Sequence, residues 1–233
     1  MSLKVVSINI EGDKHLEIVE DFLTGEQADV VCLMEVIESS LDNVLLDYPY
    51  RNFAANFRDD KENVYGVAIA SKKPWTWSES MFFDPAEPKE LSYAGGGISH
   101  RPVMVWGEMD GYIMGSVHFT WTPDGKDSDD QTRDLGKLLS NMEKKPLLMC
   151  GDFNIPRGNE NYLKLAHKYK DNIPKDIQST LDPILHYSNH EVPGNLKLVV
   201  DYVWSTPEYE VSDVRVVESV SDHCGLVFNV DLL

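Results

Sequence analysis

The chain has 233 residues, of which 42% are hydrophobic and 26% are charged, a composition that excludes large-scale disorder and favours one globular domain over residues 1–233. Its 21 basic and 39 acidic residues give a net charge of −18 at pH 7. A chain this acidic repels polyanions at long range, so broad affinity for duplex DNA or for an anionic membrane is disfavoured.

Three cysteines, Cys32, Cys150 and Cys224, are well separated and lie in apolar runs. An odd number of cysteines in such positions indicates reduced, buried thiols, not a disulfide framework or a zinc cluster. No apolar run approaches the roughly 18 residues that span a bilayer, and the amino terminus shows no basic segment followed by an apolar one. We therefore expect a soluble, cytoplasmic, monomeric protein that does not bind membranes.

Two strands joined by a helix are predicted at the start of the chain. The last residue of the first strand, Leu3–Asn9, and Glu11 are two positions apart, and Asp13 is the expected N-cap of the helix. The apolar residues at helical spacing are Leu16, Val19 and Leu23. The second strand, Asp29–Met34, is apolar throughout and ends on Glu35. The pattern predicts parallel neighbours whose polar ends meet at one edge of a sheet.

A second helix is predicted at Ile37–Leu46, and short strands then follow in close succession. These strands are Tyr50–Phe57, Val64–Ser71, Trp75–Phe83, Arg101–Met109 and Tyr112–Thr120. Turns such as Lys73-Pro74 and Asp110-Gly111 join them, and strands so closely spaced are mostly antiparallel. The glycine-rich stretch Tyr93–Ile98 lacks the strand-to-helix setting of a phosphate-binding loop, so we interpret it as a mobile rim loop.

Further along, apolar strands again end in polar residues. The strand Tyr112–Val117 leads to His118, and the acidic stretch Pro123–Asp130 is interpreted as a solvated turn because its order is not that of a calcium loop. A helix follows, with apolar residues at Leu135, Leu138, Leu139 and Met142.

The apolar run Pro146–Cys150 predicts a buried strand that ends in the sequence Gly-Asp-Phe-Asn. If the extended geometry persists through Phe153, Asp152 and Asn154 face the same side and converge on one ligand. Gly151 would let the backbone come close to that ligand.

The rest of the chain contains one more helix and three strands. The helix has apolar residues at Tyr162, Leu165, Ala166 and Tyr169, and an irregular stretch from Asp171 to Asn195 follows it. The strands are Lys197–Trp204, Val211–Val217 and Cys224–Val230. Asp201 lies in the first of them, and Asp222 and His223 come just before the last.

The polar residues at these strand ends form an ordered set of short motifs. They are Asn9 in Ser-Ile-Asn, Glu35 in Leu-Met-Glu, His118 in Val-His-Phe, Asp152 and Asn154 in Gly-Asp-Phe-Asn, Asp201 in Val-Asp-Tyr-Val, and Asp222 and His223 in Ser-Asp-His. Each motif alone is weak, but the ordered set resembles the endonuclease/exonuclease/phosphatase superfamily of magnesium-dependent phosphoesterases. Composition and periodicity alone support only an α/β or α+β fold. The resemblance implies a four-layer α/β sandwich, two mixed sheets packed face to face with helices outside.

The resemblance also implies hydrolysis of a phosphodiester or phosphomonoester by direct attack of water, with Mg²⁺ as cofactor and Mn²⁺ as a substitute. Magnesium takes oxygen ligands and keeps several waters, so one or two carboxylates suffice to hold it. Glu35 is the principal expected ligand, together with Asp222 and Asn9. Asp152 or Asn154 would complete a single shifting site or a second site.

For catalysis, the resemblance makes His223 the general base or water-orienting group, with Asp201 accepting a hydrogen bond from its other ring nitrogen. Asp152 shares that role as a holder of the attacking water. Asn154 and His118 are expected to donate to the phosphoryl oxygens or the leaving group. A lone histidine such as His118 would otherwise have a structural or surface role.

Departures from the family pattern leave the subfamily open. Family DNA-repair enzymes usually have Gln before the glutamate and Trp beside the first asparagine, where this chain has Met34 and Ile8. Arg101 is the expected contact to a substrate phosphate, with a surface ion pair as the alternative, as for Arg133. Trp121 is expected to stack on a base or aromatic leaving group, with a core position as the alternative.

Three classes of function compete. Within the phosphoesterases, a nuclease acting on nucleic-acid ends or short single strands competes with hydrolysis of a small organic phosphate. A non-catalytic binding module would usually have lost Glu35 or the Asp222–His223 pair. A zinc hydrolase would need clustered ligands, and the only adjacent pair is His223 and Cys224. The histidines that match no motif are interpreted as surface or loop residues: His15, His100, His167, His186 and His190.

Overall fold

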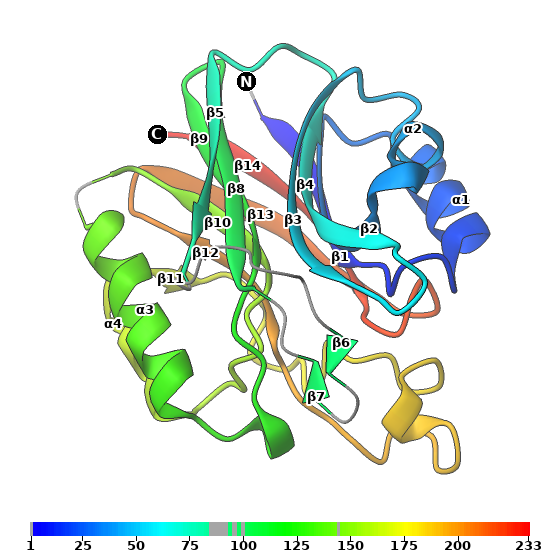
Figure 1. Ribbon diagram of the computed structural model, residues 1–233. Helices are drawn as coiled ribbons and strands as arrows, with labels where there is room; N and C mark the ends of the chain where they lie inside the picture. Colours follow the sequence, from blue (N-terminus) through cyan, green and yellow to red (C-terminus); the bar gives the residue numbers. More distant parts are fainter. Residues whose placement is uncertain (1, 84–92, 95–96, 99–100, 144) are drawn as a thin grey trace.

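The computed structural model describes residues 2–83, 93–94, 97–98, 101–143 and 145–233. Two six-stranded mixed sheets pack face to face, and the helices cover their outer surfaces (Figure 1). The α/β sandwich implied by the family resemblance is therefore confirmed. No helix in the described part of the chain is long and apolar enough to cross a membrane.

The first sheet is built around a parallel pair. Strand β1 (Leu3–Asn9) pairs with β2 (Val30–Ile37), and helix α1 (Leu16–Glu26) connects them. All other neighbours are antiparallel, in the order β13-β14-β1-β2-β4-β3. The remaining strands are β3 (Tyr50–Arg58), β4 (Val64–Ser71), β13 (Tyr209–Val217) and β14 (Gly225–Leu232).

The second sheet repeats this plan. Strand β9 (Tyr112–His118) runs parallel to β10 (Leu148–Asp152), with helix α3 (Asp129–Asn141) between them, in the order β11-β12-β10-β9-β8-β5. Its other strands are β5 (Trp77–Phe82), β8 (Val103–Met109), β11 (Lys170–Asp171) and β12 (Asp201–Ser205). Helix α4 (Glu160–Lys168) lies beside α3. Each sheet thus brings the carboxyl ends of two adjacent parallel strands to one edge.

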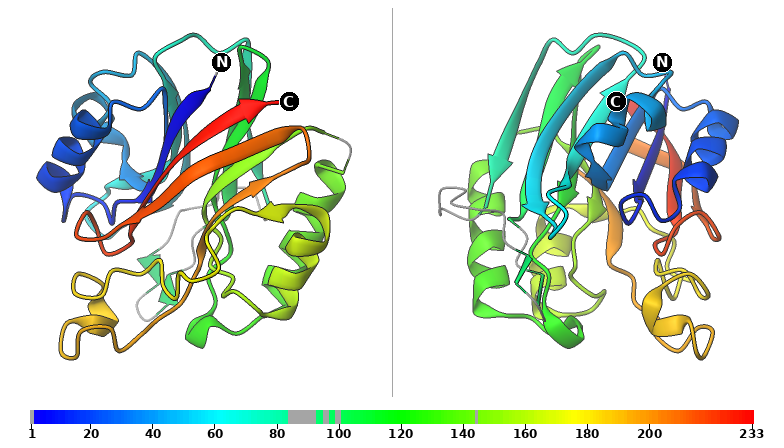
Figure 2. Two further views of the ribbon diagram at one scale, coloured as in Figure 1. Left: turned by 180° about the vertical axis from the view of Figure 1, so that it is seen from behind. Right: turned by 45° about the vertical axis from the view of Figure 1, so that its right-hand side comes forward.

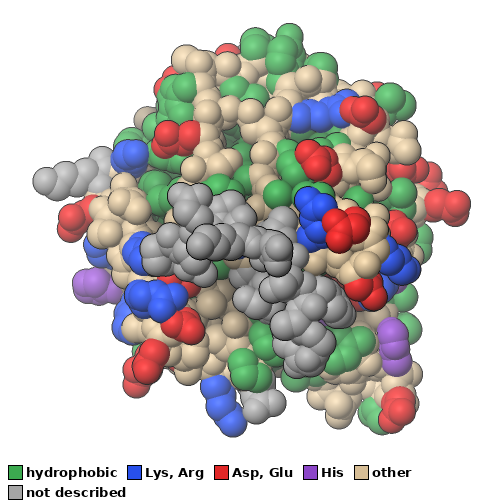
Figure 3. Space-filling view, in the orientation of Figure 1, with side chains coloured by type: hydrophobic (Ala, Val, Ile, Leu, Met, Phe, Trp, Pro, Cys, Tyr) green, Lys and Arg blue, Asp and Glu red, His purple; other side chains and the backbone are tan. Residues whose placement is uncertain are grey.

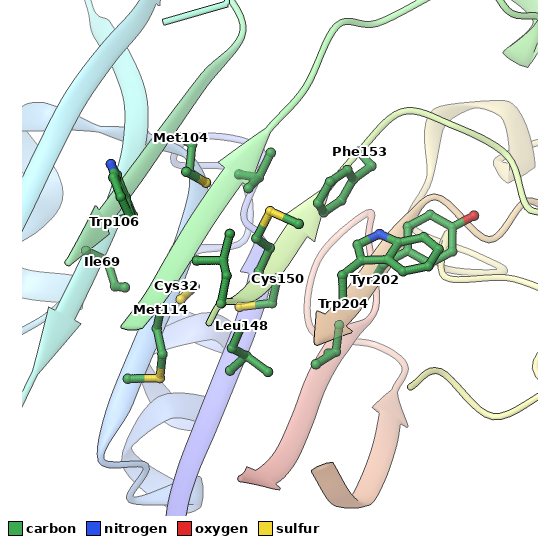
Figure 4. Close-up of a cluster of buried hydrophobic side chains, with 14 of the residues drawn as sticks. Cys32, Ile69, Met104, Trp106, Met114, Leu148, Cys150, Phe153, Tyr202 and Trp204 are labelled. Atoms are coloured by element: carbon green, nitrogen blue, oxygen red, sulfur yellow. The ribbon is translucent and has the colours of Figure 1, made fainter. Parts of the chain in front are cut away.

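Apolar side chains from both sheets fill the space between them (Figure 4). Cys32 and Ile69 from the first sheet lie among Met114, Leu148 and Cys150 from the second, and all five are buried. The cysteines are free, as expected. The core thus fixes the two sheets against each other.

Three predicted elements differ from the structure. The helix expected at Ile37–Leu46 is shorter than predicted, because β2 continues to Ile37 and a 3₁₀ turn (Glu38–Ser40) and the one-turn helix α2 (Leu41–Val44) follow. Helix α1 begins at Leu16 with His15 at its N-cap and no capping side chain, so Asp13 is not the cap. The strand expected from Lys197 begins only at Asp201.

Two predictions about turns can also be compared with the structure. Asp110 and Gly111 both have positive φ, 52° and 86°, and make the tight turn between β8 and β9 that was expected. Of the stretch Tyr93–Ile98, the described residues form the short pair β6 (Tyr93–Ala94) and β7 (Gly97–Ile98), and the rest lies outside the described residues.

Candidate active site

The carboxyl ends of the parallel strands bring the predicted polar residues together. Asn9 ends β1, His118 ends β9 and Asp152 ends β10. In the second sheet, Asp152 pairs with His118 on one side and with Asp201, the first residue of β12, on the other. Adjacent strands therefore hold three of these side chains next to each other in one row.

Glu35 reaches the site through an irregularity in β2. The pairing of β2 with β4 shifts register between Leu33 and Val36, and Glu35 has a φ of 54°. Its side chain is 24% exposed at the site, and Asn9 Nδ2 donates to its Oε1 at 3.0 Å. The same amide nitrogen lies 3.3 Å from Asp152 Oδ2, so Asn9 links the two carboxylates that come from opposite sheets.

His223 lies between two carboxylates. Its Nδ1 is 2.9 Å from Asp201 Oδ2, and its Nε2 is 3.9 Å from Asp152 Oδ2. All three side chains are buried. The hydrogen bond to Asp201 fixes the ring orientation, so the predicted His–Asp pair is present in the structure.

His118 is held by Asn56, a residue of β3 that no sequence motif indicated. The amide Nδ2 of Asn56 lies 3.0 Å from His118 Nδ1. Because the amide nitrogen donates, Nδ1 accepts and the ring hydrogen is placed on Nε2. That atom faces Glu35 Oε1 at 3.7 Å and Asp152 Oδ2 at 3.8 Å.

Burial raises the pKa of three carboxyl groups at the site. Burial raises the pKa of Glu35 to about 7, with the negative charge of Asp222 adding to the effect. Burial likewise raises the pKa of Asp152 to about 7, although the positive charge of His223 acts against it. The pKa of Asp222 is also raised by burial. Burial is thus the largest cause of all three raised pKa values.

The pKa of His223 is set by its charged neighbours more than by burial. Burial by itself would lower its pKa, but the negative charges of Asp201, Asp152 and Asp222 outweigh burial and hold the pKa well above its usual value. The acidic neighbours of the imidazole thus favour its protonated form.

One group of described side chains is compact enough to hold a cation. Ligand atoms of Asp152, Asp201 and His223 all lie within 4.8 Å of one another. In this group His223 Nδ1 and Asp201 Oδ2 already bind each other. The predicted group of Glu35, Asn9 and Asp222 shares no member with it, and within that group Asn9 Nδ2 donates to Glu35 Oε1.

Asn154 does not have the extended geometry that was expected. Its φ is 52°, and its backbone N–H donates to Asp152 Oδ1 at 2.9 Å, so a turn begins directly after β10. Its side-chain Nδ2 donates to the Phe119 carbonyl at 3.1 Å. The amide is therefore fixed against the end of β9.

Two of the histidines interpreted as surface or loop residues are shielded from solvent. His186 is buried, with its ring centroid 6.2 Å from that of His223. His15 is half-buried, and its Nε2 lies 3.3 Å from Glu11 Oε2. Glu11 and Asn9 are two positions apart, which was a usable signal, whereas nothing in the irregular stretch around His186 indicated a site. His167 and His190 are exposed as expected, and His100 lies outside the described residues.

The two predicted substrate contacts are accessible or close to the site. Trp121 is 44% exposed, so the alternative core position is wrong. The Arg101 guanidinium stacks on the Phe82 ring at 3.6 Å, and the Arg101 backbone N–H donates to Asn56, the partner of His118. Arg133 forms surface ion pairs with Asp130 and Asp134, the alternative role considered for it.

Gly151 is essential for the position of Asp152, and replacement by alanine is expected to destabilise the fold by about 3 kcal/mol or more. Its φ is +138°, and an added Cβ would lie 2.1 Å from the Val117 carbonyl oxygen. Urea unfolding measures the loss. The control is Gly136→Ala in α3, where a Cβ meets nothing within 4 Å. That variant is expected to be neutral or slightly stabilised, and equal stability of the two variants would contradict the prediction.

The sequence matches the Endonuclease/Exonuclease/phosphatase family over residues 6–223. Among solved structures, the endonuclease/exonuclease/phosphatase from Bacteroides vulgatus has 15% sequence identity and a TM-score of 0.73, with 100% of each chain covered. D. rerio TDP2 complexed with a single-strand DNA product has 17% identity and a TM-score of 0.72, with 99% of each chain covered. The mannosyl-6-phosphatase of Bacteroides thetaiotaomicron has 14% identity and a TM-score of 0.67, again with 99% of each chain covered. A search of curated protein sequences found no match.

Proposed function

The chain belongs to the endonuclease/exonuclease/phosphatase family, and from this premise we propose that it is a magnesium-dependent phosphoesterase that hydrolyses its substrate by direct attack of water. One observation supports this most. A single oxygen, Asp152 Oδ2, lies 3.3 Å from Asn9 Nδ2, 3.8 Å from His118 Nε2 and 3.9 Å from His223 Nε2. Three elements distant in sequence thus direct polar groups at one carboxylate.

The residues present fit a hard divalent cation. Glu35 offers carboxylate oxygens and Asn9 an amide oxygen, with Asp222 completing the set, and magnesium prefers oxygen ligands. Burial raises the pKa of Glu35 and of Asp152 to about 7, and a cation bound beside them would favour their ionised forms. When bound, the ion supplies positive charge that the phosphate oxygens need.

His223 and Asp152 have different roles toward the attacking water: one donates a hydrogen bond and the other accepts a proton. Because its acidic neighbours favour the protonated form of His223, its Nε2–H is a donor to a phosphoryl oxygen or to the water. The role of proton acceptor then passes to Asp152, whose pKa of about 7 suits a general base near neutral pH. Asp201 positions the imidazole and balances its charge. Of the two roles expected for His223, general base or water-orienting group, this assignment takes the second.

Other side chains are suited to bind the substrate. His118 presents Nε2 toward the centre of the site, and Asn154 has a second amide hydrogen besides the one given to Phe119. Both are donors for phosphoryl oxygens or for the leaving group. Arg101 and Trp121 contact more distant parts of the substrate.

A small organic phosphate is the second candidate substrate, and surface charge favours small over large substrates. On the face in Figure 3, the described basic side chains are scattered among acidic ones and form no continuous band. The net charge of −18 also disfavours long-range attraction of a duplex backbone. A non-catalytic module is disfavoured because Glu35, Asp222 and His223 are all present.

Chelation tests the proposal directly. Treatment with EDTA is expected to abolish hydrolysis, and Mg²⁺ or Mn²⁺ is expected to restore it. The substrates are abasic-site DNA, single-stranded DNA, RNA, a 5′-tyrosyl phosphodiester, inositol phosphates and a chromogenic phosphodiester. Full activity in EDTA would contradict the metal requirement, and no turnover on any of them would favour the non-catalytic module.

A further inference from the structure

A row of rings leads from His223 to the protein surface. The His186 ring centroid lies 6.2 Å from His223 on one side and 4.6 Å from Tyr187 on the other. Tyr187 is 68% exposed, although its neighbour His186 is buried. Both belong to the segment 182–196, which projects from the body of the protein beside the site (Figure 2, yellow). The Tyr187 ring is therefore an open surface two ring contacts away from His223.

The segment is firmly attached to the loop that carries the catalytic pair. Asp182 is buried, and its Oδ1 accepts hydrogen bonds from the backbone N–H groups of Ile184 and Leu185. Its Oδ2 accepts from Ser219 N at 2.7 Å, and its own N–H donates to the Asp222 carbonyl at 2.8 Å. Tyr187 is thus held at a fixed place relative to Asp222 and His223.

His186 is an uncharged partner in this row. Ser188 N–H donates to its Nδ1 at 3.3 Å, which places the ring hydrogen on Nε2. The His186 ring backs the Tyr187 ring at a centroid distance of 4.6 Å, so the pair presents a flat ring surface.

The same segment exposes other apolar side chains. Ile184 is 58% exposed and Val192 is 60% exposed. One exposed apolar side chain needs no explanation, but three on one anchored segment beside a catalytic site indicate a binding surface.

We propose that Tyr187, backed by His186, is the stacking platform for the base of a nucleotide whose phosphoester is held at Asp152 and His223. The inference rests on the proposed function and names its substrate class. A nucleotide carries a flat base and a phosphoester on one sugar. The base can lie on the Tyr187 ring while the phosphoester lies at His223, because the structure holds these two residues at a fixed separation. Base stacking on aromatic side chains is sequence-tolerant. The net charge of −18 favours a mononucleotide or short single strand over a duplex.

Matched substrates test this platform. One pair is a dinucleotide with a base beside the scissile phosphate and the same dinucleotide with an abasic sugar there. The other pair is adenosine 5′-monophosphate and ribose 5-phosphate. Tyr187→Ala is expected to lower kcat/KM about tenfold on the base-containing member, mainly through KM, and to change the base-free member roughly twofold or less. Tyr187→Phe keeps the ring and should behave like the wild type.

Tyr50→Ala is the matched control, because Tyr50 is a half-exposed tyrosine at the start of β3, paired with Ser71 at the opposite edge of the sheet. It should change neither substrate. Three results would overturn the platform. The wild type could have equal kcat/KM for both members of a pair, or Tyr187→Ala could lose the same activity on both members. The third result is a preference for a tyrosyl phosphodiester over nucleotides.

Calorimetric binding of adenosine 5′-monophosphate and ribose 5-phosphate separates the platform from the proposed function. Tighter binding of the nucleotide that is lost in Tyr187→Ala, in a protein that hydrolyses no phosphoester, would support the platform and refute the hydrolase. Hydrolysis without any preference for a base would support the hydrolase and refute the platform.

Discussion

Replacement of His223 by alanine is expected to lower kcat/KM by about a thousandfold or more on any substrate that the wild type hydrolyses. The ring donates from Nε2 toward the reacting phosphate, and it supplies the positive charge nearest to Asp152. Loss of both effects acts mainly in the transition state, so kcat should fall more than KM rises. Steady-state kinetics measure this, with His167→Ala on the exposed face of α4 as the control.

Asp201 acts through His223, and the pH profile distinguishes this from a merely structural role. Its charge contributes to the raised pKa of the imidazole, so Asp201→Asn should lower that pKa. If the protonated ring is the active form, the alkaline limb of kcat then moves to lower pH. In the His223→Ala background, Asp201→Asn should have little further effect.

Retention of a tenth or more of wild-type activity by His223→Ala would contradict the catalytic role assigned to His223.

The sequence predicted the site well where strand ends determine it. Asn9, His118 and Asp152 each follow an apolar run, and the ends of neighbouring parallel strands meet at one edge. The parallel arrangement of β1 and β2 followed from their apolar patterns and the helix between them. The pairing of the two sheets, by contrast, came from the family resemblance, because periodicity does not specify which faces pack together.

The contacts that no motif indicated depend on long-range packing or local backbone geometry. Asn56 lies in an antiparallel strand that reads as ordinary β-structure, and only the packing of the first sheet against the second brings it to His118. His186 comes from an irregular segment without periodicity, placed by Asp182. The left-handed conformation of Asn154 results from its hydrogen bond to Asp152, which a strand pattern does not encode.

Replacement of Glu35 by glutamine is expected to abolish hydrolysis, by about a thousandfold or more, while it stabilises the metal-free protein. Glutamine is nearly isosteric and still offers Oε1 to Asn9, so the fold should persist. It removes the carboxylate that is the principal proposed magnesium ligand. Thermal unfolding with added Mg²⁺ provides a second measurement, since Mg²⁺ should raise the Tm of the wild type and have little effect on the variant.

The stabilisation should depend on pH in a defined direction. The pKa of Glu35 rises from 4.5 in the unfolded chain to about 7 in the folded one, so the folded state binds more protons between these values. Stability contributed by this group is therefore greatest below pH 4.5 and is lost as pH rises toward 7, with a cost of the order of 2–3 kcal/mol. In EDTA at about pH 8, Glu35→Gln should unfold roughly 5 °C above the wild type.

The difference in Tm should close as the pH approaches 4.5, because the wild-type carboxylic acid is then neutral like the amide. A variant less stable than the wild type at about pH 8 would mean that the Glu35 carboxylate is compensated by protein groups alone. That result would argue against Glu35 as the carboxylate that needs a bound cation. A generally stabilising substitution would raise Tm equally at both pH values. A gain in Tm only at the higher pH would mean that the ionised Glu35 carboxylate destabilises the wild-type fold at this edge of the sheet.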